Sequence, residues 1–88
     1  MQPGRKPYPL VRVSPQLRER YNEAISIGLG AATIAAVAGF PQTAALSTQM
    51  HAARVAASPL VVERFERVAE ILGVPADQIF VTVEEARS

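Results

Sequence analysis

Residues 31–51 read AATIAAVAGFPQTAALSTQMH. The apolar run over 31–38 predicts a short helix, and Gly39 is a natural stop for it because helices often end on a residue in the left-handed region. A turn follows at Phe40, and the pattern resumes as a longer helix over about 42–52. The stretch therefore predicts two short helices joined by a tight turn with glycine at its corner.

The side chains around this turn have the sizes that a close helix crossing needs. Ala35 is small enough for the two helices to approach closely, and Gly39 turns the chain. The side chain of Phe40 is expected to pack in the core and hold the turn there. Two helices joined in this way form the helix-turn-helix pattern, whose second helix enters the major groove of DNA. The sequence therefore predicts a DNA-binding motif.

The flanking sequence predicts two further helices. Ser14-Pro15 and Ser58-Pro59 each read as an N-cap followed by proline at the first helical position. They open helices over about 15–27 and 58–72, the latter ending at Gly73. Apolar residues at helical spacing mark the expected core faces. These residues are Leu17, Tyr21, Ala24 and Ile25; Ile34, Ala35 and Ala38; Leu46 and Met50; and Leu60, Val61, Phe65, Val68, Ala69 and Leu72.

Two segments near the ends favour strands. Residues 10–13 and 80–83 are rich in β-branched side chains and are bounded by proline or charge. Neither is stable alone, so they are expected to pair with each other or with their copies in a second subunit. A short turn is expected over 75–78.

Composition and charge narrow the function. Hydrophobic residues make up 49% of the 88 residues but aromatics only 6%, which predicts a thin core. The chain has no cysteine and one histidine, so we expect neither an enzyme nor a metal site, and no cofactor. We expect a cytoplasmic protein without a signal peptide or membrane span. Residues 1–54 carry a net charge of +4 and residues 55–88 one of −3, which favours an anionic partner for the first half.

The sequence resembles the Cro/phage-repressor (xenobiotic-response-element) family of helix-turn-helix domains over about residues 17–80. The resemblance rests on Ile34-Ala35 to Gly39-Phe40 at the motif centre and on the phrase from Phe65 to Phe80. It implies a mainly α, five-helix domain that binds operator DNA, commonly as a dimer. With the strand segments added, the expected fold is that domain over 10–83, with a small two-stranded β element, a flexible arm over 1–9 and a tail over 84–88.

The third helix contains the expected base contacts. At about 100° per residue, its outer face is opposite Leu46 and Met50, and no acidic residue occurs from Gly28 through Pro59. Gln42 suits adenine, Ala44 a thymine methyl, and Ser47 and Thr48 either bases or phosphate. The whole predicted DNA-binding set is Thr33, Gln42, Thr43, Ala44, Ser47, Thr48, His51, Arg54, Arg5 and Lys6.

The sequence leaves several alternatives open. His51 is equally compatible with a DNA contact and an ordinary surface position, whereas Arg54 favours a phosphate contact. Arg5 and Lys6 belong either to a DNA-tracking arm or to a solvated tail. The usual branched position of the third helix falls on Ala45, which indicates either a turn longer by one residue or a rotated helix.

The expected function is sequence-specific binding of double-stranded DNA by a small Cro- or repressor-like transcriptional regulator, with a phage or mobile-element origin. The expected state is a homodimer that forms fully only on DNA, with no small-molecule ligand. One alternative is an antitoxin or other protein-interaction module in which DNA binding is secondary. Another is an assembly protein that keeps the fold without binding DNA.

Overall fold

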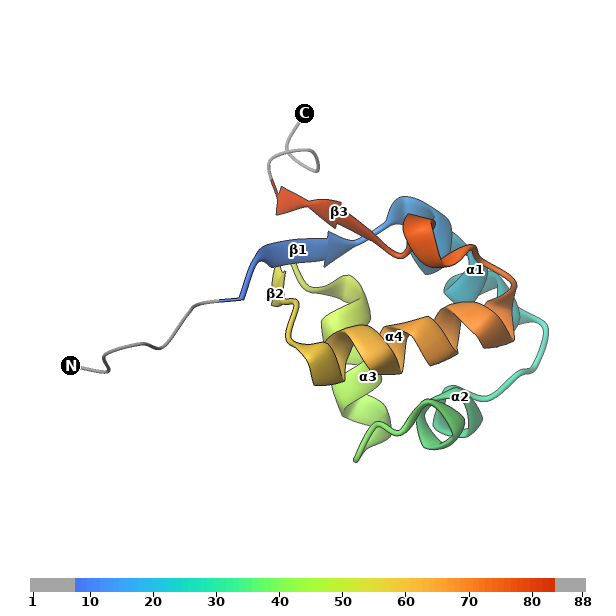
Figure 1. Cartoon of the computed structure of the whole chain (residues 1–88). Helices are drawn as coiled ribbons and strands as arrows, with labels where there is room; N and C mark the ends of the chain where they lie inside the picture. Colours follow the sequence, from blue (N-terminus) through green and yellow to red (C-terminus); the bar gives the residue numbers. More distant parts are fainter. Residues whose placement is uncertain (1–7, 84–88) are drawn as a thin grey trace.

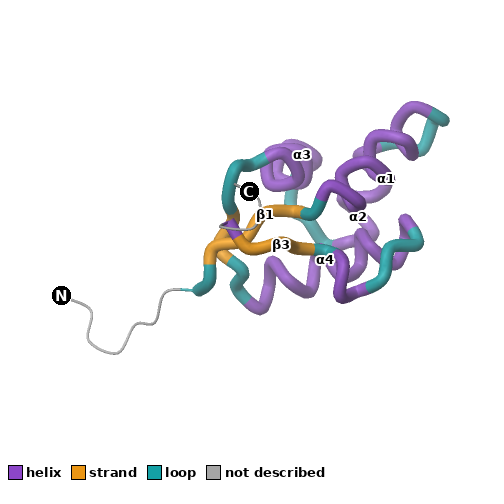
Figure 2. The backbone as a smooth tube through the Cα atoms, turned by 90° about the horizontal axis from the view of Figure 1, so that it is seen from above, coloured by secondary structure: helices purple, strands orange, loops and turns teal. Residues whose placement is uncertain are grey.

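The computed structural model describes residues 8–83 and shows four α-helices and a three-stranded antiparallel sheet (Figure 1). The sheet lies at one end of the molecule, next to the start of α4, and the helices form the rest (Figures 1 and 2). In chain order the elements are β1 (Leu10–Val13), α1 (Pro15–Ser26), α2 (Ala31–Ala38), α3 (Thr43–His51), β2 (Val55–Ala56), α4 (Pro59–Leu72), a 3-10 turn (Ala76–Gln78) and β3 (Phe80–Thr82).

The helix boundaries follow from local capping. The Ser14 hydroxyl accepts a hydrogen bond from the Leu17 amide at 3.1 Å, and the Ser58 hydroxyl accepts one from the Val61 amide at 3.3 Å. Gly39 ends α2 with a φ of 90°, in the left-handed region that favours glycine. The predicted starts of α1 and α4 and the predicted end of α2 are confirmed.

The sheet joins the two ends of the described chain. Its order is β2-β1-β3, and the register with β3 places Arg12 opposite Val81 and Val13 opposite Phe80. The expected β element therefore forms within one chain, by pairing of its N- and C-terminal segments. The third strand, β2, was not predicted. It pairs antiparallel with β1, on the side of β1 that faces away from β3.

The core is centred on Phe65. Its ring packs edge-on against the rings of Phe40 and Phe80, with centroid distances of 5.5 and 5.6 Å. Helix α4 thus contacts both the turn after α2, through Phe40, and the sheet, through Phe80. The remaining buried residues are mostly small or aliphatic. They include Val13, Leu17, Tyr21, Ala24, Ile34, Ala35, Ala38, Leu46, Met50, Val68, Ala69, Leu72, Val74 and Ile79.

Three expectations need correction. The fifth helix is only the three-residue 3-10 turn Ala76–Gln78. Ile25 and Leu60 were placed on core faces, but they are 38% and 56% exposed. At about 100° per residue, Ile25 lies roughly 80° from Leu17, and Leu60 lies roughly 140° from Phe65 around the helix axis. Both side chains therefore lie outside the buried face of their helix.

No helix among residues 8–83 is long and apolar enough to cross a membrane.

Candidate nucleic-acid interface

Helix α3 has one buried side and one exposed side. Leu46 and Met50 are fully buried, whereas Ala44, Thr48 and His51 are exposed. These two groups lie on opposite sides of a helix with about 100° between residues. The expected orientation of α3 is therefore found in the structure.

The N-terminal end of α3 is open to solvent. Gln42 occupies the N-cap with extended backbone, its side chain makes no capping hydrogen bond, and both it and Thr43 are exposed. The amide of Gln42 is thus available to an outside partner. The helix is joined to α2 by the short turn at Gly39, and α2 packs against both α3 and α4.

Ser47 differs from its neighbours because it lies at the edge of the exposed face. It is half-buried, and its hydroxyl oxygen lies 3.4 Å from that of Tyr21 on α1. This contact connects α3 to α1.

His51 is exposed but held in one orientation. Its Nδ1 lies 3.1 Å from the Ser47 carbonyl oxygen, and its ring meets that of Tyr21 edge-on. Because a carbonyl only accepts, Nδ1 donates this hydrogen bond. The other ring nitrogen, Nε2, is left for a partner.

Arg18 fixes the C-terminal end of α3. From α1, its Nε donates to the Met50 carbonyl at 2.9 Å, and its Nη2 donates to the Ala52 carbonyl at 3.1 Å. A cation here also suits the partial negative charge at a helix C-terminus. Burial, followed by the nearby charge of Arg12, lowers the pKa of Arg18 from its ordinary value.

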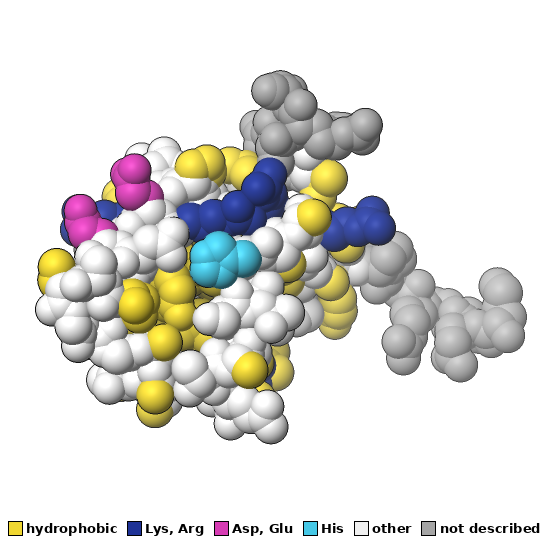
Figure 3. Space-filling view, turned by 180° about the vertical axis from the view of Figure 1, so that it is seen from behind, with side chains coloured by type: hydrophobic (Ala, Val, Ile, Leu, Met, Phe, Trp, Pro, Cys, Tyr) yellow, Lys and Arg dark blue, Asp and Glu magenta, His cyan; other side chains and the backbone are white. Residues whose placement is uncertain are grey.

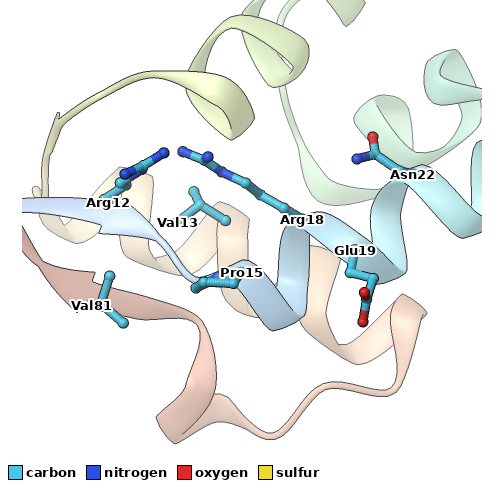
Figure 4. Close-up of a pocket in the computed structure, with 7 residues that line it drawn as sticks. All are labelled: Arg12, Val13, Pro15, Arg18, Glu19, Asn22 and Val81. Carbon is cyan, nitrogen blue, oxygen red and sulfur yellow. The ribbon is translucent and has the colours of Figure 1, made fainter. Parts of the chain in front are cut away.

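An open hollow of about 620 Å³ lies beside this end of α3, between β1 and α1. Figure 4 shows the guanidinium groups of Arg12 and Arg18 pointing toward one another across it, while the carboxylate of Glu19 points away. The lining residues are Arg12, Val13, Pro15, Arg18, Glu19, Asn22 and Val81.

Sequence reasoning missed both of these arginines. Arg12 had a usable signal, because it alternates with Val11 and Val13 in a strand and must therefore lie on the opposite face. Arg18 lies about 100° from Leu17, at the edge of the core stripe of α1. Its partners are 32 and 34 residues away in the chain, and no local pattern indicates them.

The other predicted contact residues lie around α3 or outside the described chain. Arg54 is exposed just after α3, and Thr33 is exposed on the first turn of α2. Figure 3 shows arginine side chains directly beside the histidine, with the acidic side chains of that view farther away. Arg5 and Lys6 lie outside the described residues, as do most of the predicted arm and the whole predicted tail.

No cluster of three or more His, Cys, Asp or Glu side chains that could hold a metal ion occurs within residues 8–83. No family model, curated protein or solved structure matches the chain.

Proposed function

We propose that this chain binds double-stranded DNA through a helix-turn-helix of the Cro/repressor type, formed by α2, the turn at Gly39 and α3, and that it regulates transcription as a homodimer on its operator. The observation that carries the proposal is the exposed face of α3. The side chains on this face are small and uncharged, and arginines lie next to it.

The small side chains on this face suit a helix that must approach base edges closely. Ala44 and Thr48 are exposed there, and no acidic residue occurs from Gly28 through Pro59. A carboxylate in that stretch would be repelled by the phosphates of both DNA strands. An ordinary solvated helix has no such reason to lack acids.

The proposed contacts divide into base readout and backbone positioning. Gln42, with its free amide at the N-terminal end of α3, suits bidentate bonding to adenine, and Thr48 suits a base edge or a thymine methyl. Arg54 suits a phosphate. Ser47, which contacts Tyr21, supports the orientation of the helix instead of reading bases.

Duplex binding at several salt concentrations tests the proposal. With roughly four to six phosphate contacts per protomer, log K should fall with log[salt] at a slope of about −4 to −5. Fluorescence anisotropy on a labelled duplex of random sequence measures this slope. An absence of binding at about 50 mM salt would contradict the proposal.

Two substitutions then separate readout from positioning. Gln42→Ala should cost about 1–3 kcal/mol at the preferred site and relax base preference there. Arg54→Ala should weaken binding to all sequences alike and reduce the salt slope by about 1. Selection from a randomised duplex library with each variant measures both effects. An unchanged base preference in Gln42→Ala would mean that α3 does not meet the bases in this orientation.

A further inference from the structure

Two positive side chains face each other in the hollow between β1 and α1 without a carboxylate between them. The one ion pair found within residues 8–83 joins Glu63 and Arg67 on α4. Glu19 lines the same hollow, but its carboxylate points away from both guanidinium groups (Figure 4). Neither guanidinium therefore has a carboxylate partner among residues 8–83, and Arg18 is offset only by backbone carbonyls at the end of α3.

The strand sets the face on which Arg12 lies, and backbone carbonyls hold the guanidinium of Arg18. Arg12 is placed by the strand, because its neighbour Val13 is buried and successive side chains of a strand point to opposite faces. Arg18 is held by its bonds to the Met50 and Ala52 carbonyls. Two like charges kept close together repel each other, and an anion between them would remove that repulsion.

We propose that Arg12 and Arg18 together bind one phosphate group at the C-terminal end of α3. Arginine donates several N–H groups in a planar fork that matches phosphate oxygens. With Nε and Nη2 of Arg18 engaged, its Nη1 is left to donate, and Arg12 supplies its whole fork. Arg18 loses little side-chain freedom on binding, because its bonds to two carbonyls already fix it.

The occupant that we favour is a phosphodiester of the DNA backbone, and that identification rests on the proposed function. The hollow adjoins the end of α3 next to His51, the helix proposed to enter the groove. A backbone contact here would set how far α3 enters the groove. A free phosphate ion would be bound by the same arginine groups. The test therefore has one arm for the free ion and one for the DNA backbone.

The first arm uses inorganic phosphate and the full chain. Arginine Nε–Hε signals are followed by NMR during titration with phosphate, against chloride at matched ionic strength. The signals of Arg12 and Arg18 should shift saturably with phosphate, that of Arg67 should not, and the shift at Arg18 should vanish in Arg12→Ala. Arg67 is the control because it lies on α4, paired with Glu63 at 3.7 Å.

The second arm measures the salt slope of binding to a random duplex. Arg12→Ala should reduce the slope by about 1, whereas Arg67→Ala should leave it unchanged and Arg12→Lys should largely restore it. Thermal melts check that each variant folds. Arg18 is left intact because its loss would disturb the end of α3.

The two arms separate the inference from the proposed function. Phosphate-specific shifts without any DNA binding would retain the site for a free phosphate ion and contradict the proposed function. DNA binding with an unchanged slope in Arg12→Ala and no phosphate-specific shifts would overturn the inference and leave the proposed function standing. A reduced salt slope in Arg12→Ala supports a phosphate of the DNA backbone as the bound group. Phosphate-specific NMR shifts with an unchanged salt slope support a free phosphate ion.

Discussion

Ser14 joins the two ends of the described chain through one buried side chain. Its hydroxyl accepts from the Leu17 amide at the start of α1 and donates to the Gln78 carbonyl at 2.5 Å. Its own amide donates to the Ile79 carbonyl at 2.8 Å. Ser14 itself is only 1% exposed, whereas Gln78 is an exposed residue.

Replacing this hydroxyl should therefore cost more than the loss of an ordinary cap. Ser14→Ala removes the cap and also leaves the Gln78 carbonyl without its partner, so we expect a loss of about 2–3 kcal/mol in the free energy of unfolding. Ser58→Ala is the matched control because the Ser58 hydroxyl caps α4, and it should lose about 1 kcal/mol. Urea unfolding measures both values. Equal losses would show that the bond to Gln78 adds nothing.

At the scale of elements, the turn between α2 and α3 depends on glycine. Gly39 has a φ of 90°, and a Cβ atom there would come within 3.2 Å of the Arg67 guanidinium. Gly30, at the N-cap of α2, has a φ of −69°, and a Cβ there would meet only Thr33 Oγ1 at 3.7 Å. The two glycines flank the same helix but differ in conformation.

Alanine substitution should separate the two positions. Gly39→Ala is expected to lose about 1–2 kcal/mol of stability, because alanine is strained in the left-handed region. Gly30→Ala should change stability by less than about 0.5 kcal/mol, since its backbone is open to any residue. Thermal melts of the two variants give the comparison. A Gly39 variant as stable as the Gly30 variant would show that the turn tolerates other conformations.

The elements also show which features a sequence can reveal. The caps at Ser14 and Ser58 and the stop at Gly39 are local, and they were predicted correctly. Strand β2 has only two residues, too few to show alternation, and its pairing with β1 spans the whole of α1 to α3. The bonds from Arg18 to the end of α3 are equally non-local, so the place of Arg18 in the candidate site needed the structure.

At the scale of the whole molecule, charge and topology both bear on assembly. Three glutamates, Glu63, Glu66 and Glu70, outnumber the two arginines of α4, whereas Arg12, Arg18 and Arg54 lie around the end of α3. This separation should orient the molecule toward a polyanion. Because β3 pairs with β1 of the same chain, folding does not need a second subunit to complete the sheet.

The melting temperature of the free protein should therefore not depend on its concentration. A subunit that must associate in order to fold is stabilised by mass action, whereas this chain closes its own sheet. We expect the same melting temperature at about 5 and about 500 µM, with dimers forming on a palindromic duplex. Calorimetry and sedimentation measure the two quantities. A melting temperature that rises with concentration would indicate that the subunits exchange strands.

The position of α3 on DNA is the central claim, and site-directed photocrosslinking tests it most directly. The chain has no cysteine, so Thr48→Cys places a single azidophenacyl group on the exposed face of α3. Glu66→Cys places the same group on the exposed side of α4 as a control. We predict crosslinks to bases of the duplex from position 48 and none from position 66. Crosslinks from position 66 with none from position 48 would contradict the account.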